Sequence, residues 1–202
     1  MAKEAENKIL EVARKQFVNN GYAATRMDEI AKEAGYNKAL VHYYFRSKEK
    51  LFREIIVQIL NTFIPRVTYA LKQEGTFWEK TELLLDTYLT LFLEQPDIPF
   101  FMMSELSQKR ENFVIEIKKR ASYFPAITDY ILQMHKEMEE GKLRKIPPVH
   151  LLLNVMSMTV FPFISKPVFA TILEYSDEEF EHLMKERKEI VMDFLKHALQ
   201  PA

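Results

Sequence analysis

The sequence predicts an all-α protein with a small three-helix unit at the N-terminus and a larger helical body. Apolar residues recur at steps of three and four, which is the spacing of a helix with one buried face. The four glycines fall between these periodic stretches, where helices end. With 202 residues, of which 48% are hydrophobic, the chain can form one large or two modest helical domains.

The first helix is predicted to run from about Lys3 to Asn19, with Gly21 just past its end. Its apolar stripe consists of Ile9, Leu10, Ala13 and Phe17. We expect this stripe to be core, so the helix serves as a buttress on which the next two helices pack.

Residues 25–50 contain the starts of three further helices and a glycine turn. Thr25 and Asp28 have the spacing of a capping pair, and Gly35 is placed to close the helix that they begin. Asn37 is placed to cap a short second helix. Two short helices about a glycine-containing turn are typical of the helix-turn-helix motif, whose second helix lies in the major groove of DNA. The same pattern also occurs in all-α proteins that do not bind DNA.

The third of these helices joins the N-terminal unit to the body. Ser47 is placed to cap it, and Lys48 lies in its first turn, where free backbone N–H groups attract phosphate. Its apolar pattern runs on past Pro65 to Leu71. Because proline removes one backbone hydrogen bond and clashes with the preceding turn, a kink or break is expected near residues 61–64.

The body is predicted to contain several more helices. They cover Phe77 to about Leu93, Asn112 to about Arg120, Tyr123 to Glu140, Val149 to Phe161, and a last helix that begins after Ser176. Ser176 and Glu179 have the spacing of a capping box. Pro162 and Pro167 are expected to break the chain before the last helix.

A dense group of aromatic and thioether side chains, residues 100–103, follows Pro96 and Pro99. These side chains are either ordinary core or the wall of an adaptable apolar cavity, and the sequence alone leaves both interpretations open. Candidate pocket residues are bulky, apolar and on helices expected to surround the centre of the body. They are Phe63, Tyr88, Phe92, Phe101, Met102, Met134 and Phe161.

From Ile9 to Ile56, about a quarter of the chain, the sequence resembles the N-terminal domain of the TetR family of bacterial transcriptional repressors. The matching residues are Ala13, Phe17, Gly21, Tyr22, Thr25, Ile30-Ala31, Ala34-Gly35, Asn37-Lys38, Tyr44-Phe45, Lys48 and Leu51. The stretch that begins at Gly141 resembles the segment before the penultimate helix of TetR-type effector domains. This resemblance implies a DNA-binding domain at residues 1–50 and a ligand-binding and dimerisation domain at residues 51–202.

The resemblance implies a ligand-responsive transcriptional regulator, a repressor that a small lipophilic effector releases from a palindromic double-stranded DNA operator. Implied DNA contacts are Thr25, Arg26, Asn37, Lys38, Ala39, Leu40, His42, Tyr43 and Lys48. Of these, Thr25, Arg26 and Lys48 are expected on backbone phosphate, and residues 37–40 at base edges. Leu40 and His42 depart from the family pattern, so the operator sequence cannot be transferred from relatives.

The resemblance also implies a homodimer in which the last two helices pair with their copies in a four-helix bundle. The expected interface residues are Leu152, Met156, Phe180, Leu183, Met184, Val191, Phe194 and Leu195. The alternative is that both apolar stripes are buried within one chain.

Composition points to a cytoplasmic protein. The chain has no cysteine, which excludes disulfides and thiolate metal sites and suits a reducing compartment. No membrane segment is expected, because polar residues and Pro162 interrupt the longest apolar run. Residues 1–50 carry 10 basic and 7 acidic residues, a net charge of +3, whereas the remainder carries 18 and 22, a net charge of −4. This asymmetry suits a basic DNA reader on an acidic body.

Other chemistry has little support in the sequence. There is no clustered glycine loop for phosphate and no recognisable nucleophile, so no enzyme activity and no cofactor are expected. Glu179 and His182 form one Glu-x-x-His step, but a di-iron site needs a second, so no metal is expected. Two alternatives remain: a DNA-binding regulator without an effector, and a helical small-molecule carrier or enzyme whose N-terminal domain is structural.

Overall fold

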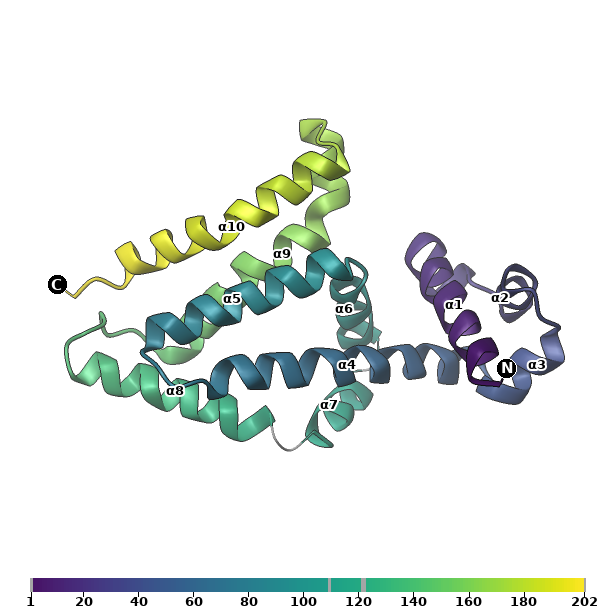
Figure 1. The fold of residues 1–202 in the computed structure, drawn as a ribbon, viewed down its shortest axis with the longest axis horizontal. Helices are drawn as coiled ribbons and strands as arrows, with labels where there is room; N and C mark the ends of the chain where they lie inside the picture. Colours follow the sequence, from purple (N-terminus) through teal and green to yellow (C-terminus); the bar gives the residue numbers. More distant parts are fainter. Residues whose placement is uncertain (1, 109, 121–122, 202) are drawn as a thin grey trace. The chain divides into compact units, whose positions relative to one another are not determined.

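The computed structural model describes residues 2–108, 110–120 and 123–201, and within these ranges the secondary structure is entirely helical (Figure 1). The helices are α1 (Ala2–Ala24), α2 (Met27–Ala34), α3 (Lys38–Phe45), α4 (Lys48–Lys72), α5 (Phe77–Glu94), α6 (Ile98–Gln108), α7 (Arg110–Lys118), α8 (Tyr123–Glu139), α9 (Pro148–Leu173) and α10 (Asp177–Ala198). The predicted fold class is therefore confirmed.

The chain divides into two compact units. The N-terminal unit comprises Met1–Asn61 and Phe100–Glu116, and the C-terminal unit comprises Thr62–Pro99 and Ile117–Ala202. Helix α4 contributes residues to both units, as does the α6–α7 segment. The division describes packing only, and the functional boundary at residue 50 stays a prediction.

The N-terminal unit has an aromatic core that includes part of α6. Phe52 on α4 contacts Phe17 on α1 edge to face, with ring centroids 5.1 Å apart, and it also lies 5.4 Å from Phe101 on α6. An ion pair of 2.7 Å joins Arg53 on α4 to Glu116 on α7. The Glu116 side chain is only 8% exposed, so the carboxylate end of this pair is buried. Phe101 is thus core of the N-terminal unit.

Gly35 closes α2 as predicted and Gly21 interrupts the first helix with a kink, but the capping pair at Thr25 is wrong. Gly21 adopts φ 74° and ψ 166° and kinks α1, and Gly35 ends α2 in the left-handed conformation. Arg26 is the N-cap of α2, without a side-chain hydrogen bond. Thr25 lies one residue before this N-cap, and its hydroxyl donates instead to the carbonyls of Gly21, at 2.8 Å, and Gln16, at 3.1 Å.

The predicted caps of α3 and α4 are confirmed. The Asn37 side-chain oxygen accepts a hydrogen bond from the Leu40 amide at 2.8 Å. The Ser47 hydroxyl oxygen accepts one from the Lys50 amide at 3.2 Å. Each cap satisfies a backbone donor that has no partner inside its own helix, so both helix starts are specified by local sequence.

The predicted breaks at Pro162 and Pro167 are wrong, and of the kink or break predicted before Pro65, the break is wrong. Helix α4 runs through Pro65, and α9 runs through Pro162 and Pro167. Pro65 is exposed, so its ring fits without displacing another helix. In α9, Pro162 cannot donate to the carbonyl of Met158, four residues before it, and Nε of Arg187 on α10 donates to that carbonyl instead, at 3.2 Å.

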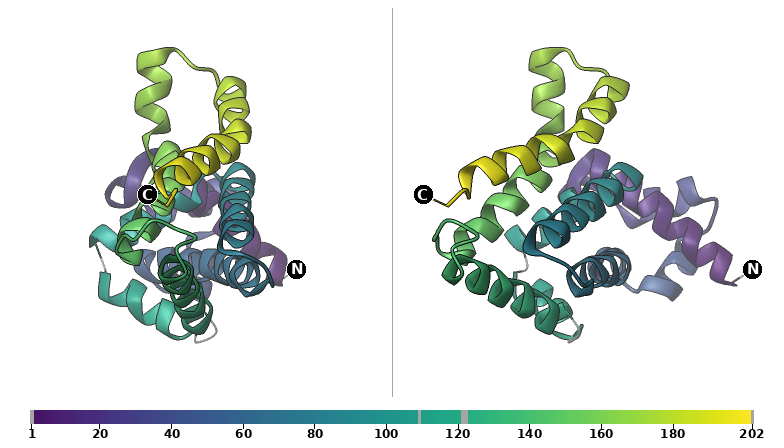
Figure 2. Two further views of the ribbon diagram at one scale, coloured as in Figure 1. Left: turned by 90° about the vertical axis from the view of Figure 1, so that its left-hand side faces the viewer. Right: turned by 60° about the vertical axis from the view of Figure 1, so that its left-hand side comes forward.

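The C-terminal unit is built on α5, which packs against α8, α9 and α10 (Figure 1). The loop between α8 and α9 is tied to the end of the chain, since the Arg144 amide donates to the Leu199 carbonyl at 2.9 Å. Figure 2 shows the end of α9 and the start of α10 projecting from the rest of this unit as a helical hairpin. The capping box at Ser176 and Glu179 is confirmed.

Helix α9 is long and apolar enough to cross a membrane by length and composition alone, and only 28% of its apolar window is buried. One such helix is weak evidence for a membrane span, because core helices of soluble proteins meet the same criterion. What the observation does establish is that much of an apolar helix is left uncovered within one chain.

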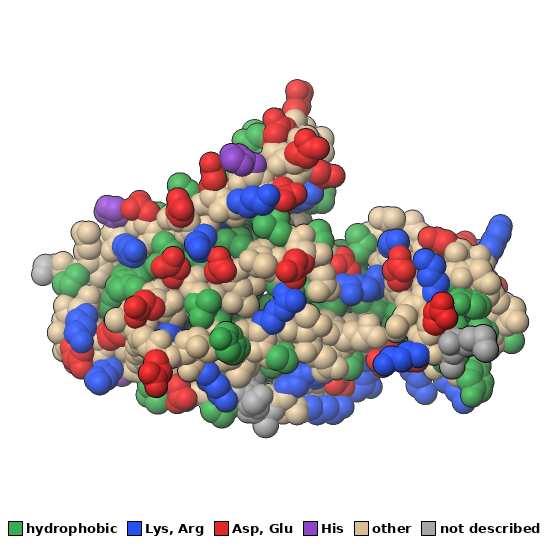
Figure 3. Space-filling view, in the orientation of Figure 1, with side chains coloured by type: hydrophobic (Ala, Val, Ile, Leu, Met, Phe, Trp, Pro, Cys, Tyr) green, Lys and Arg blue, Asp and Glu red, His purple; other side chains and the backbone are tan. Residues whose placement is uncertain are grey.

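The start of α10 is expected to respond to acid. Acidic side chains gather there (Figure 3), and hydrogen bonds from the Ser176 amide and then its hydroxyl lower the pKa of Glu179. A carboxylate whose pKa is lowered by folding stabilises the fold at pH values above its unfolded pKa, and this contribution is lost as pH falls through the folded pKa. Amide exchange in the first turn of α10 should therefore accelerate, relative to intrinsic rates, as pH drops below about 4.5.

The variant Glu179→Gln provides the control, because it keeps an acceptor oxygen but cannot titrate. Its first-turn amides should show little of this pH response. An identical response in both proteins would show that another group is responsible.

Candidate nucleic-acid interface

Helices α2 and α3 form the predicted helix-turn-helix, with α3 presenting one face to solvent. Val41 and Phe45, four residues apart, are the buried pair on α3. On the other side, Lys38 and Ala39 in the first turn are exposed, and Tyr43 is 68% exposed. A large aromatic side chain this exposed, beside a helix start without acidic residues, suits contact with a DNA backbone.

Lys38 is held loosely. Its ammonium lies 2.9 Å from Oδ1 of Asp28 on α2, and both side chains are well exposed. An exposed pair of this kind contributes little to stability, because solvent screens it. The ammonium can therefore exchange the carboxylate for a phosphate or a base edge.

The other predicted DNA contacts on and beside α3 differ in how accessible their side chains are. Asn37 uses its side-chain oxygen to cap the helix, which leaves its amide nitrogen for other partners. Nδ1 of His42 lies 3.2 Å from the carbonyl oxygen of Arg46. Leu40 and His42 are half-buried, whereas Arg26, just before α2, is exposed.

Thr25 and Lys48 have internal partners. Thr25 is 1% exposed and its hydroxyl is occupied by α1, so it has no accessible side chain for the predicted phosphate contact. The Lys48 ammonium donates to the carbonyls of Tyr22, Ala23 and Thr25, at 2.8, 3.2 and 2.9 Å. Sequence reasoning missed both arrangements, since all the acceptors are backbone carbonyls, and those of Lys48 lie 23 to 26 residues earlier in the chain.

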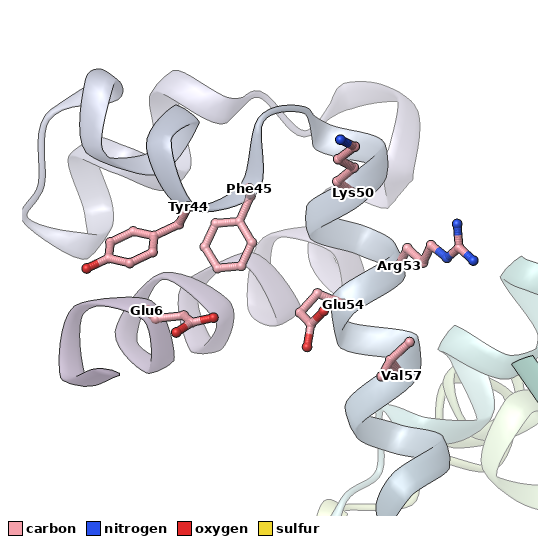
Figure 4. Close-up of a pocket in the computed structure, with 7 residues that line it drawn as sticks. All are labelled: Glu6, Tyr44, Phe45, Lys50, Arg53, Glu54 and Val57. Carbon is pink, nitrogen blue, oxygen red and sulfur yellow. The ribbon is translucent and has the colours of Figure 1, made fainter. Parts of the chain in front are cut away.

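A cavity of about 350 Å³ opens on the N-terminal unit between α1, α3 and α4. Its lining residues are Glu6, Tyr44, Phe45, Lys50, Arg53, Glu54 and Val57 (Figure 4). In Figure 4 the carboxylates of Glu6 and Glu54 lie near the ring of Phe45. The lining carries two carboxylates and two cations, so it offers no net positive charge to a nucleic-acid phosphate, and none of the predicted DNA contacts lines it.

The structure brings three of the predicted pocket residues into mutual contact. The ring of Phe63 on α4 lies 5.3 Å from Tyr88 and 6.3 Å from Phe92, both on α5. Phe163 on α9, which the sequence reasoning missed, extends the cluster and lies 5.3 Å from Phe92. Helix α9 had to continue through Pro162 for Phe163 to reach this position. We call these four side chains the aromatic cluster.

The other predicted pocket residues do not share one environment. Met134 on α8 is buried, Met102 is half-buried, and Phe161 is exposed. Phe101 belongs to the N-terminal unit. Choosing residues by size and apolar character did not separate those facing the centre from those on the surface.

The predicted interface residues divide between core and surface. Phe180, Met184, Val191 and Leu195 are buried within this chain, and Phe180 contacts Phe163 at 5.7 Å. Leu152 and Met156 are half-buried, and Leu183 and Phe194 are exposed. Other large apolar side chains exposed on α9 and α10 are Val149, Leu153, Phe161, Ile164, Val168, Phe169, Ile172, Leu173 and Ile190.

Within the described ranges, no group of three or more His, Asp or Glu side chains is placed to hold a metal ion. Glu179 caps α10, and His182 lies 3.4 Å from Glu186. The single Glu-x-x-His step is therefore explained by local helix contacts.

Residues 9–55 match the model of bacterial regulatory proteins of the tetR family. An uncharacterised HTH-type transcriptional regulator of Bacillus subtilis, YhgD, is 30% identical over 129 residues, which are 59% of this chain and 68% of that protein. The fatty acid metabolism regulator protein of Bacillus subtilis is 23% identical over 152 residues, which are 75% of this chain and 77% of that protein. The crystal structure of a tetR-family protein from Rhodococcus RHA1 superposes with a TM-score of 0.74, at 20% identity and with 98% of each chain covered.

Proposed function

This chain belongs to the TetR family of bacterial regulatory proteins, and on that basis we propose a homodimeric repressor that a small lipophilic ligand releases from a palindromic operator. The observation that carries the proposal is the open first turn of α3, with exposed Lys38 and Ala39 and no acidic residue. We place its action in the cytoplasm. Residues 1–50 are the proposed DNA-binding domain, and residues 51–202 bind the ligand and the second copy.

The proposed DNA contacts lie at the N-terminus of α3 and beside it. Lys38, Ala39 and the amide nitrogen of Asn37 meet base edges, and Leu40 can contact a thymine methyl group. Arg26 binds phosphate, since it is exposed directly before α2 and its guanidinium suits phosphate geometry. His42 and Tyr43 flank this surface.

A second copy of the chain is the proposed cover of the exposed faces of α9 and α10. These faces carry large exposed apolar residues, and only 28% of the α9 window is buried within one chain. Two reading helices related by a two-fold axis can then occupy half-sites about 34 Å apart, one turn of DNA. One short helix alone would read only a few base pairs.

The aromatic cluster is the proposed place of ligand action. The cluster joins α4, α5 and α9. A ligand inserted among these rings therefore acts both on α4, which leads to the DNA-binding domain, and on α9, which carries part of the proposed dimer face. The Bacillus subtilis relative named as a regulator of fatty acid metabolism makes fatty-acyl compounds the first class to test. A hundredfold loss of DNA affinity requires only about 2.7 kcal/mol of coupling.

Thermal unfolding in the presence of fatty acids and acyl-coenzyme A thioesters of different lengths tests the ligand. A bound compound at 100 times its dissociation constant should stabilise the protein by about 2.7 kcal/mol. The same compound should lower the affinity of the protein for DNA, and bound DNA should lower its affinity for the compound by an equal factor. A panel that shifts neither stability nor DNA affinity would favour a regulator without an effector.

A further inference from the structure

The junction between α1 and α2 is held by one side chain from α4. Helix α1 ends at Ala24, so the carbonyls of its last turn have no amide further along the helix to accept from. Lys48, the first residue of α4, donates to the carbonyls of Tyr22, Ala23 and Thr25. A cation at this helix end also interacts favourably with the helix dipole.

The next turn of α4 strengthens the same attachment. The Lys48 ammonium lies 4.7 Å from the centre of the Tyr22 ring, a cation–π contact. Phe52, four residues further along α4, meets Tyr22 edge to face with ring centroids 5.2 Å apart. Lys48 and Phe52 thus present one face of α4 to the end of α1.

This arrangement uses every hydrogen-bond donor of the Lys48 ammonium group. An ammonium group carries three N–H donors, and three carbonyl oxygens lie within 3.2 Å of it. A DNA phosphate could bind Lys48 only by displacing one of them. The last of the three carbonyls belongs to Thr25, directly before Arg26, the N-cap of α2.

We propose that Lys48 is a positioning residue that locks the start of α4 to the entry of α2, and that it does not neutralise a DNA phosphate. Because α2 packs on α3, fixing the entry of α2 to the start of α4 makes the helix-turn-helix move together with α4. Its consequence for operator binding rests on the proposed function. This assignment separates Lys48 from Arg26, which remains the proposed phosphate contact.

The test compares Lys48→Met with Lys50→Met. Both variants remove one positive charge from the first turn of α4, but the Lys50 side chain is exposed and makes none of the three carbonyl contacts. Without DNA, amide exchange of residues 22–27 should rise roughly tenfold or more in Lys48→Met only, because loss of the lock lets the junction open locally. Lys48→Arg, which retains charge and donors, should restore protection. If Lys48→Met does not fold, Lys48→Gln, with two donors and no charge, takes its place.

The second arm measures operator affinity against salt, well below the unfolding temperature. Lys48→Met should bind roughly tenfold more weakly than Lys50→Met, with the same log–log salt slope, because the bound complex keeps its phosphate contacts. A slope smaller by about 2 per dimer than that of Lys50→Met would make Lys48 a phosphate contact and overturn the proposal. Equal affinities of the two variants would reduce Lys48 to a stabilising role and also overturn it.

The two arms fail separately. If the wild-type protein bound no operator, the proposed function would be wrong. The exchange measurement would still show whether Lys48 holds the junction between α1 and α2. Unchanged exchange at residues 22–27 in Lys48→Met overturns the lock, and raised exchange with rescue by Lys48→Arg supports it.

Discussion

A chain carrying Phe194→Asp is expected to be a monomer in solution and to bind operator DNA roughly a hundredfold more weakly, or worse, since the second half-site contributes through effective concentration. Phe194 lies on the proposed dimer face of α10 and is 57% exposed within one chain. A two-fold interface brings the same patch of both copies together. Each dimer would therefore bury two carboxylates without partners, at a cost of several kcal/mol.

Sedimentation velocity gives the oligomeric state, and fluorescence anisotropy gives the DNA affinity at matched protein concentrations. Lys196→Asp is the matched control, because Lys196 is exposed two residues further along α10 and points to a different side of the helix. It should remain dimeric. A dimeric Phe194→Asp protein with normal DNA affinity would place the interface elsewhere.

A chain carrying Ala39→Asp is expected to lose operator binding by roughly a hundredfold or more while remaining as stable as the wild type. The new carboxylate would face the bases and the phosphates, and like-charge juxtaposition at an interface costs several kcal/mol. In the free protein, an acid in the first turn of α3 interacts favourably with the helix dipole, which offsets the lower helix propensity of aspartate. Net stability should change by less than about 0.5 kcal/mol.

Thermal unfolding and DNA titration on the same samples separate the two effects. Ala39→Ser, which changes the side chain without adding charge, should retain most of the affinity. Full operator affinity in Ala39→Asp would mean that the first turn of α3 does not face DNA.

Local sequence was sufficient to predict the helix ends that depend on one or two neighbouring residues. Asn37, Ser47 and Ser176 cap as predicted, because each side chain meets an amide three residues further on. Gly35 ends α2 because glycine adopts the left-handed conformation at little cost. These contacts are complete within one turn of chain.

Long-range contacts were the ones that could not be predicted. From the sequence, Pro162 predicts a helix break. The helix continues because Arg187, distant in sequence, donates to the Met158 carbonyl that Pro162 leaves without a backbone donor. The three carbonyls that accept from the Lys48 ammonium lie 23 to 26 residues earlier in the chain. In each case the acceptor is a backbone carbonyl. Every residue has one, so the residue types in the sequence do not indicate which carbonyl is bound.

The candidate sites show the same division. The reading face of α3 was predictable because Val41 and Phe45 orient the helix by their spacing alone. The faces of α9 and α10 were not, because both helices carry apolar residues over more than one side. Phe180 and Phe194 look equivalent in sequence, yet Phe180 is core and Phe194 is exposed.

Titration of the protein with a palindrome selected from random DNA, and with the same DNA after one half-site has been scrambled, tests the central claim most directly. A dimeric reader should prefer the intact palindrome by roughly a thousandfold over bulk DNA and lose much of that preference when one half-site is scrambled. If the dimer neutralises about eight phosphates, the log–log salt slope should be near −7. Equal affinity for the intact, half-scrambled and bulk DNA at every salt concentration would contradict operator reading by this protein.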